Sequence, residues 1–165
     1  MQKFLMTQEG YSKLNIDLKK LINEDRPEII ERLKDSRGYG GELSENTEYM
    51  EAKDAQDIVE RKIVEIQNKL DNAKVVSLLD LVNDGVARFG TIVSLIDLDT
   101  DLNVEYQIVG VDESSIKDSK ISYLSPIGSA MLNKKVGDII YFVTPSGERE
   151  LEIIKVTLPN ITKPA

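Results

Sequence analysis

The residues most capable of chemistry lie in one short acidic segment, which runs from Glu42 to Glu48. Glu42 and Glu45 are three residues apart, so a helical turn can place both carboxylates on one face. Such oxygen ligands suit Mg²⁺, which usually takes one or two protein carboxylates and keeps its other positions for water and substrate phosphates. The pair could therefore complete a metal site only together with another molecule, and we expect no metal to be bound stably by the free protein.

The same segment also fits a purely structural role. Acidic residues in the first turn of a helix favour its dipole, and Ser44 is a good N-cap for a helix that starts at Glu45. Arg37 and Lys53, close by in the sequence, could be solvated helix charges. Tyr49 falls on an apolar stripe, where packing alone would explain it. The residue types by themselves leave both interpretations open.

Two apolar stripes with helical spacing predict the elements that position this segment. The first runs from Tyr11 to Leu33 and changes register near Pro27, where a kink or a restarted turn is expected. The glycines of 38–41 can turn the chain sharply, which predicts an antiparallel hairpin over residues 1–76 with a functional tip near 37–49. The second stripe has the a and d spacing of a coiled coil and contains Tyr49, Ala52, Gln56, Val59, Ile63, Ile66, Leu70 and Ala73.

The second half of the chain has the pattern of a small α+β domain with a mainly antiparallel sheet, expected over residues 87–165 after a linker at 77–86. A short helix is expected at about Ile127–Leu132, after Ser125 and Pro126. The expected strands, rich in Val, Ile and Tyr, are Arg88–Asp97, Val104–Val109, Lys120–Leu124, Asp138–Val143 and Arg149–Val156.

The composition excludes several classes of function. The chain of 165 residues has neither cysteine nor histidine, which removes disulfides, thiolate metal sites and the commonest general base. Its net charge of −8 argues against binding nucleic acid by phosphate neutralisation. There is no apolar run approaching the roughly 18 residues of a membrane span. We therefore expect a folded, cytoplasmic protein that does not contact a membrane. We also expect a monomer.

Several segments resemble the GreA-type factors of the bacterial Gre family of transcript-cleavage elongation factors. The likeness to the family's coiled-coil arm lies in 26–30, 43–49, Ala52-Lys53 and 69–73. The likeness to its FKBP-like C-terminal domain lies in 89–93, 106–110, 125–130, 136–138 and 144–147. These segments follow the family order over nearly the whole chain, and only 161–165 fall outside.

The resemblance implies a transcription elongation factor that enters RNA polymerase through its secondary channel. In the family, the C-terminal domain docks at the channel rim, and the arm reaches toward the polymerase's active-site Mg²⁺. An Asp-x-x-Glu pair at the tip is thought to help hold a second Mg²⁺ and an attacking water, so that backtracked RNA is cut. The factor would then be no enzyme and would have no cofactor of its own, because it stimulates cleavage by the polymerase. Its partners would be RNA polymerase and the 3′ end of the nascent RNA.

Carried over by position, the resemblance assigns roles to residues of this chain. Glu42 and Glu45 would be the metal-assisting acids, and Tyr49 would match the family's aromatic residue near the tip. Arg37 and Lys53 would match the basic patch that contacts the RNA 3′ segment. Ser125 and Pro126 are expected in the polymerase-docking domain.

Two departures from the family pattern fall at the tip. Glu42 stands where Asp is usual, and the glycine-rich turn is one residue longer. Glu has one more methylene and one more torsion than Asp, so its carboxylate can be displaced by about 1 Å or more. A displacement of this size in a site can lower the rate about 100-fold.

Three alternative functions remain open. An inhibitory Gre homologue would occupy the channel without promoting cleavage. A peptidyl-prolyl isomerase or chaperone would use the FKBP-like half, which a proline-isomerisation assay would detect. A purely structural coiled-coil adaptor would leave RNA cleavage unaffected by changes at the tip.

Overall fold

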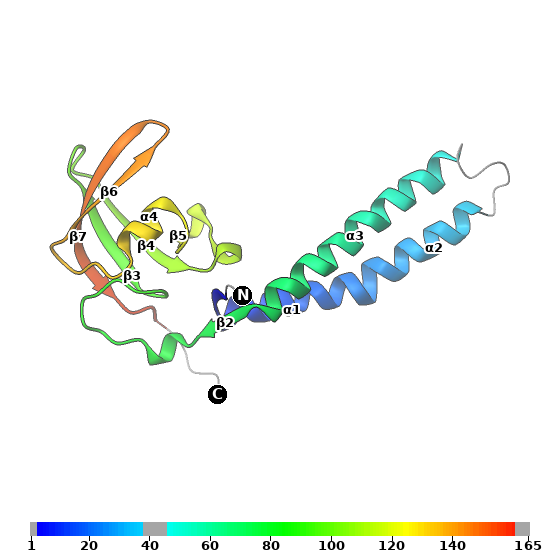
Figure 1. Cartoon of the computed structure of the whole chain (residues 1–165), viewed down its shortest axis with the longest axis horizontal. Coiled ribbons are helices and arrows are strands. Elements are labelled where there is room, and N and C mark those ends of the chain that lie inside the picture. The colour runs from blue at the N-terminus through cyan, green and yellow to red at the C-terminus, as the bar shows by residue number, and fades with distance from the viewer. Residues whose placement is uncertain (1–2, 38–45, 161–165) are drawn as a thin grey trace. The chain divides into compact units, whose positions relative to one another are not determined.

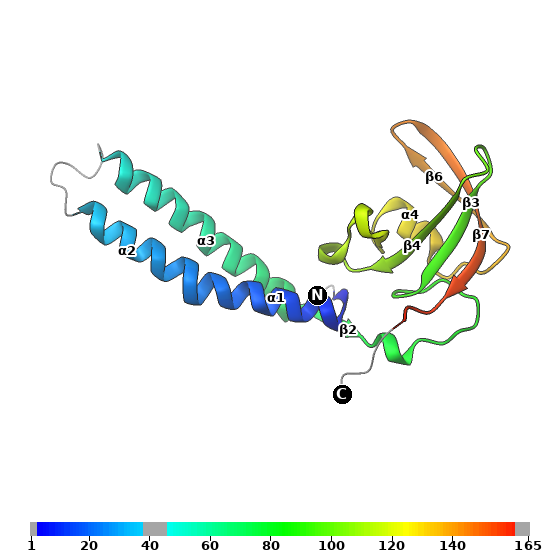
Figure 2. The same cartoon turned by 180° about the vertical axis from the view of Figure 1, so that it is seen from behind.

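A computed structural model describes residues 3–37 and 46–160 of the chain (Figures 1 and 2). The chain divides into two compact units: Tyr11–Ala73 forms the first, and Lys3–Gly10 joins the residues from Lys74 onward in the second. None of the described helices is long and apolar enough to cross a membrane.

The first unit is a hairpin of long helices. The chain runs through α1 (Gln8–Lys20), a π-helical turn (Leu21–Asp25) and α2 (Arg26–Arg37), and returns as α3 (Thr47–Asp71). In both views α2 and α3 lie side by side along their lengths. The helical hairpin predicted from the two apolar stripes is therefore confirmed.

The predicted irregularity near Pro27 takes the form of the π-turn. The Arg26 N–H donates to the Leu21 carbonyl, five residues back instead of four. This wider turn adds one residue, so the buried stripe passes from Leu21 to Ile29 and Leu33. In a regular α-helix the Pro27 ring would collide with the carbonyl four residues earlier. The helix is thus continuous, with one turn widened by one residue at the position where proline follows.

The two helices pack through a narrow apolar seam. Its buried members are Leu21, Ile29, Leu33, Ala52, Val59 and Ile63. Ala52 is 1% exposed, and its small side chain allows the helix backbones to approach closely. Beside the seam, Arg26 forms a bidentate ion pair with Glu60 on the opposite helix, with N–O distances of 2.8 and 2.9 Å.

The second unit is built on a five-stranded sheet in the order β5-β4-β3-β7-β6. Its strands are β3 (Ile92–Asp97), β4 (Asn103–Val109), β5 (Lys120–Ser122), β6 (Ile139–Thr144) and β7 (Gly147–Thr157). All neighbouring pairs are antiparallel except β4 and β5, which are parallel. The sheet is therefore mixed, and mainly antiparallel as predicted.

Helix α4 (Pro126–Met131) packs on one face of this sheet. The core between them includes Leu95, Ile108, Met131, Ile140 and Ile153, all at most 2% exposed. The first strand of the sheet begins at Ile92 instead of the predicted Arg88. The reason is a turn, closed by the Thr91 N–H on the Arg88 carbonyl, in which Gly90 has a φ of +92°.

The N-terminal segment of the chain belongs to this second unit. Strand β1 (Phe4–Thr7) pairs with β2 (Ala73–Val76) in a separate two-stranded sheet. The Thr7 N–H donates to the Glu113 carboxylate at 3.0 Å, and the Thr7 hydroxyl also bonds to it. The Tyr123 hydroxyl accepts from the Leu5 N–H at 3.2 Å. The segment before the long helices is thus held by residues more than 100 positions away.

Candidate functional site at the tip of the helical hairpin

The ends of the two helices at the tip are joined by one side chain. The side-chain oxygen of Asn46 (Oδ1) accepts from the Tyr49 N–H at 3.1 Å. The side-chain amide nitrogen (Nδ2) donates to the backbone carbonyl of Ser36 at 2.8 Å. Asn46 therefore satisfies a free N–H in the first turn of α3 and a free carbonyl in the last turn of α2. This contact fixes how far apart the two helix ends lie.

Asn46 corrects the predicted start of the second helix. Ser44 was expected to cap a helix starting at Glu45, whereas α3 starts at Thr47 with Asn46 as its N-cap. Asparagine and serine are comparably good caps. The choice depends on Ser36, which lies on the other helix and which the local sequence does not reveal.

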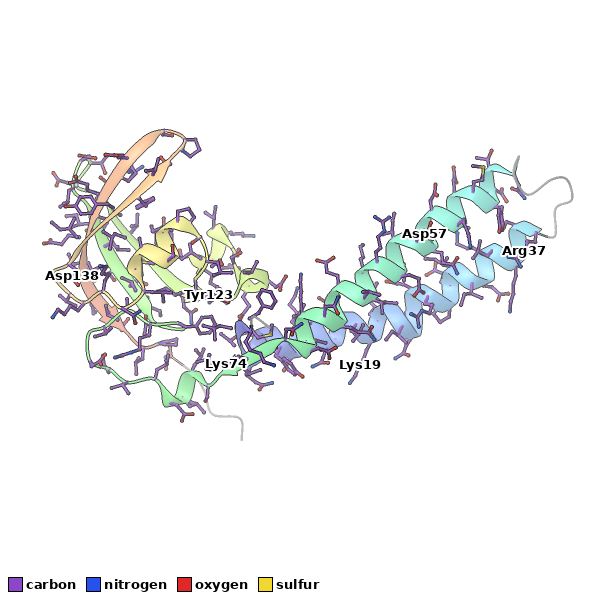
Figure 3. All side chains as sticks on the ribbon, in the orientation of Figure 1. Lys19, Arg37, Asp57, Lys74, Tyr123 and Asp138 are labelled. Carbon is purple, nitrogen blue, oxygen red and sulfur yellow. The ribbon has the colours of Figure 1, made fainter. Side chains whose placement is uncertain are left out.

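Three of the predicted site residues come together next to this contact. The Arg37 guanidinium carbon lies 5.6 Å from the centre of the Tyr49 ring, an arrangement that favours a cation over the ring face. Lys53 follows Tyr49 by four residues and so lies on the same side of α3. Arg37 and Lys53 are exposed, while Tyr49 is half-buried and packs against the seam. Figure 3 shows Arg37 at the end of α2.

Tyr49 thus has the packing role that its seam position predicted, and it also positions a cation. Lys53 is oriented along α3 by a hydrogen bond from its Nζ to the Gln56 side chain at 3.3 Å. The described part of the tip therefore presents two cations beside an aromatic ring. This set can contact a phosphate and the sugar or base attached to it.

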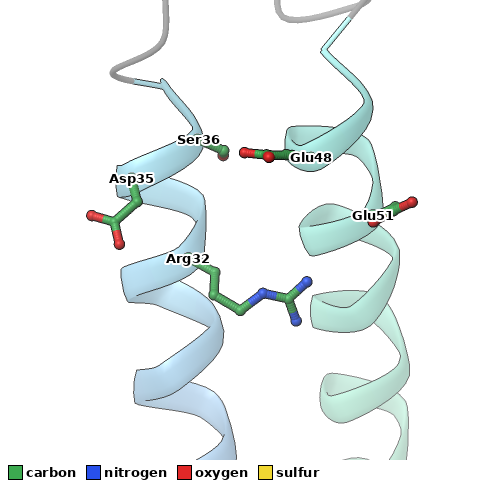
Figure 4. A pocket seen from close by; sticks show the side chains of 5 residues that line it. All are labelled: Arg32, Asp35, Ser36, Glu48 and Glu51. Carbon is green, nitrogen blue, oxygen red and sulfur yellow. The ribbon is translucent and has the colours of Figure 1, made fainter.

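A cleft of about 310 Å³ lies between α2 and α3 just below these residues. Figure 4 shows the Arg32 guanidinium reaching into it from α2, while Ser36 and Glu48 face one another across the gap. Asp35 and Glu51 complete the lining. With three carboxylates against one guanidinium, the cleft is acidic and does not suit a phosphate.

Glu42 and Glu45, the predicted metal-assisting acids, lie outside the described residues. Within residues 3–37 and 46–160, no three acidic side chains gather closely enough to hold a metal ion.

Ser125 and Pro126, predicted in the docking domain, open helix α4 in the second unit. The Ser125 hydroxyl accepts from the Gly128 N–H at 3.1 Å and donates to the Ser122 carbonyl at 2.6 Å. A Cβ on Gly128 would lie 2.0 Å from that carbonyl oxygen, so the loop requires glycine there. Pro126 and Leu124 are exposed. Ser125 therefore shapes this loop, and its two neighbours form the accessible surface.

Glu113 is a structural anchor that the sequence did not indicate. Besides Thr7, its carboxylate accepts from the Gly110 N–H at 3.2 Å. Its partners are the N-terminal strand and a turn in the second half of the chain, and no local pattern connects these two segments.

Both units match known family models. Residues 4–75 match the N-terminal domain of transcription elongation factors, and residues 82–158 match the C-terminal domain of GreA and GreB. The transcription elongation factor GreA of Beijerinckia indica is 41% identical over 94% of this chain and 98% of its own length. GreA of Phenylobacterium zucineum is 42% identical over the same shares of the two chains.

Among solved structures, GreA factor homolog 1 of Thermus thermophilus is 24% identical over 94% of this chain and 99% of its own. Its TM-score of 0.41 is too low to add to the assignment. Both family models cover their own unit of the chain, and the curated relatives match over nearly their whole length. From these matches, the chain belongs to the GreA/GreB family of transcription elongation factors and is of the GreA type.

Proposed function

We propose that this transcription elongation factor binds RNA polymerase through the secondary channel and stimulates the polymerase's own Mg²⁺-dependent cleavage of backtracked RNA. Family membership supports the proposal, and so does one feature of the structure. The hairpin gathers Arg37, Tyr49 and Lys53 at the end that also carries Glu42 and Glu45 in the sequence. Groups able to bind RNA and groups able to assist a metal are thus concentrated at one end of the long arm.

In the proposed reaction, the polymerase supplies the RNA and a bound Mg²⁺, and Glu42 and Glu45 supply carboxylates for a second Mg²⁺. Water attacks the phosphorus of a phosphodiester, and the bond from phosphorus to the 3′ oxygen breaks. The retained RNA then has a 3′ hydroxyl that can be extended, and the released fragment has a 5′ phosphate. The two Mg²⁺ ions, when bound, would supply electrostatic stabilisation for this displacement, with Glu42 and Glu45 helping to hold one of them.

Arg37 and Lys53 would position the RNA 3′ segment by contacting its phosphates. Because the Arg37 guanidinium lies over the Tyr49 ring, this contact would restrict its motion before RNA binds, and less conformational entropy would be lost on binding. Tyr49 itself is held in place by the Asn46 cap at its backbone and by the seam at its ring.

Docking would use the loop before α4. Pro126 and Leu124 offer a small apolar surface there, and the bonds of Ser125 keep the loop in one conformation.

RNA cleavage in a purified, backtracked elongation complex tests the proposal. The intact protein should increase the cleavage rate, and Glu42→Ala with Glu45→Ala should return it to the level without factor. Glu28→Ala with Glu31→Ala is a matched control, because these two exposed acids of α2 are also three residues apart. The control pair should leave stimulation unchanged.

A parallel measurement of binding to polymerase separates the alternatives. Binding with unchanged or suppressed cleavage would support an inhibitory homologue. If the variant with Glu42→Ala and Glu45→Ala still stimulated RNA cleavage, the helical hairpin would be a structural adaptor. No binding at all would contradict the proposed partner.

A further inference from the structure

The face of the sheet opposite α4 carries large apolar side chains in contact with water. On the edge strand β6, Ile139, Tyr141 and Val143 are 41%, 65% and 70% exposed, whereas Ile140 between them points into the core. An antiparallel sheet with one solvated face usually presents polar residues on that face. Three apolar side chains in a row on an edge strand are instead typical of a surface that a partner covers.

A row of glutamates runs beside this apolar row on the neighbouring strand. The strand register pairs Ile139 with Glu152, Tyr141 with Glu150, and Val143 with Glu148. Directly opposite residues of paired strands lie on one face. Successive glutamates are therefore about 6.8 Å apart along β7.

Nothing in the described part of the chain neutralises these three carboxylates. None of them takes part in an ion pair with a described residue. Beyond the row, Ile96 of β3 pairs with Glu152, so this carboxylate lies between apolar side chains on two strands. A partner that covered the apolar residues would bring its own charges against the acidic row.

The charge pattern limits what can bind. A second copy of this chain would bring its acidic row against the first, because a two-fold contact pairs the same surface with itself. Nucleic acid would meet three carboxylates on a protein of net charge −8. The surface therefore suits a partner that has basic and apolar side chains in adjacent rows.

We propose that this surface binds a basic amphipathic helix of a partner protein. We call it the β6–β7 face and define it by Ile139, Tyr141, Val143, Glu148, Glu150 and Glu152. Residues four apart on a helix rise about 6 Å, close to the spacing of the glutamates. A helix of about three turns along the strands places an apolar stripe on β6 and a row of Lys or Arg on β7, whose aliphatic stems cover the remaining apolar surface.

This site is separate from the loop at Ser125 and Pro126, because α4 packs on the other face of the sheet. It also does not depend on the tip of the hairpin. The proposal therefore holds or fails independently of the proposed function.

The test uses a fluorescent helix-forming peptide of about 16 residues made of Ala, Leu and Lys, with a leucine stripe beside a lysine row. A second peptide of the same composition has its order scrambled, so that neither row exists. Both are titrated with the full chain at about 0.15 M salt, where long-range attraction is largely screened. The patterned peptide should bind at least about tenfold more tightly than the scrambled one.

Variants of the chain identify the surface. Glu148→Gln, Glu150→Gln and Glu152→Gln together should weaken binding of the patterned peptide by about tenfold. Tyr141→Ser should weaken it by at least about threefold, and this exposed change leaves the core intact. The charge-matched control, Glu28→Gln, Glu31→Gln and Asp57→Asn, alters exposed acids of the hairpin and should change affinity less than twofold.

The proposal would be overturned if the patterned peptide did not bind, if both peptides bound equally, or if the control variant lost as much affinity. A wild-type chain that dimerises, with Tyr141→Ser restoring the monomer, would assign the surface to a second copy and would also overturn it. Far-UV circular dichroism of each variant verifies folding. If the variant with Glu148→Gln, Glu150→Gln and Glu152→Gln does not fold, the affinity of Tyr141→Ser decides the outcome.

Discussion

At the scale of single residues, Asn46 determines the geometry of the tip. The side-chain oxygen of Asn46 caps α3, and its side-chain amide donates to the Ser36 carbonyl at the end of α2. We expect Asn46→Ala to lower the free energy of unfolding by about 1 kcal/mol through the lost cap. Asn46→Asp keeps the capping oxygen and loses only the donor to Ser36, so its effect should be smaller. Urea denaturation measures both, and equal losses would show that the cap contributes nothing.

Asp97 gives the second unit a dependence on pH. Its buried carboxylate bonds to the Arg149 guanidinium and accepts from the N–H groups of Asp99 and Thr100 at 2.9 and 3.2 Å. The bond to Arg149, followed by the bonds to these N–H groups, keeps the pKa of Asp97 below its usual value.

The folded state therefore favours charged Asp97. Its contribution is complete above the unfolded pKa of about 3.9 and is lost as the pH falls through the lower folded value. We expect the free energy of unfolding to decrease on acidification below about pH 4. Asp97→Asn should flatten this dependence. In contrast, Asp84→Asn should change it little, although the Arg88 bond lowers the pKa of Asp84 to about 2, because this pair is exposed. Urea denaturation at several pH values decides between these outcomes.

Residue by residue, the sequence predicted best where a role depends on local spacing. Tyr49 was expected on the seam because this position follows from helix periodicity, whereas the contact between Arg37 and Tyr49 joins two helices and was not predicted. Asn46 and Glu113 were missed because their partners, Ser36 and Thr7, lie on other elements, and a single sequence gives no sign of such pairs.

At the scale of elements, the π-turn at Leu21–Asp25 reconciles a proline with a continuous apolar stripe. The shift in the stripe was predicted, but its form was not, because a broken helix and a widened turn displace the stripe equally. The direction of β5 was likewise hidden, since alternation of side chains is the same in parallel and antiparallel strands.

A deletion tests this account of the π-turn. Removing the exposed Glu24 would let the stripe run in a regular α-helix, but Pro27 would then disrupt the helix interior. We expect the deletion alone to cost about 3 kcal/mol of stability, and the deletion combined with Pro27→Ala to recover most of it. Thermal denaturation gives the comparison. If Pro27→Ala brings no recovery in the deleted chain, the π-turn has another cause.

In the organisation of the described chain, two stretches that are far apart in the sequence belong to the same unit. Lys3–Gly10 packs with the residues that follow Lys74, and the helical hairpin is inserted between these two stretches. The curated relatives confirm the predicted family and its role in transcription elongation. The assignment of Glu42 and Glu45, the RNA contacts and the limits of the predicted domains stay predictions.

Glu113 should stabilise this arrangement. In Glu113→Ala the N–H groups of Thr7 and Gly110 lose their acceptor, which should cost about 1–3 kcal/mol and speed amide exchange at both residues. Glu105→Ala, which removes only an exposed 3.1 Å hydrogen bond from the Ser94 hydroxyl, is the matched control. Unchanged exchange at Thr7 in Glu113→Ala would contradict the anchoring role.

Glu42 and Glu45 should help the polymerase hold a second Mg²⁺. The most direct measurement is the cleavage rate of a backtracked complex as a function of Mg²⁺ concentration, with the intact factor and with Glu42→Gln plus Glu45→Gln. If Glu42 and Glu45 assist the metal, the intact factor reaches its half-maximal cleavage rate at a lower Mg²⁺ concentration than the variant, and high Mg²⁺ partly restores cleavage with the variant. Identical Mg²⁺ dependence in both, with a difference only in the maximal rate, would contradict it.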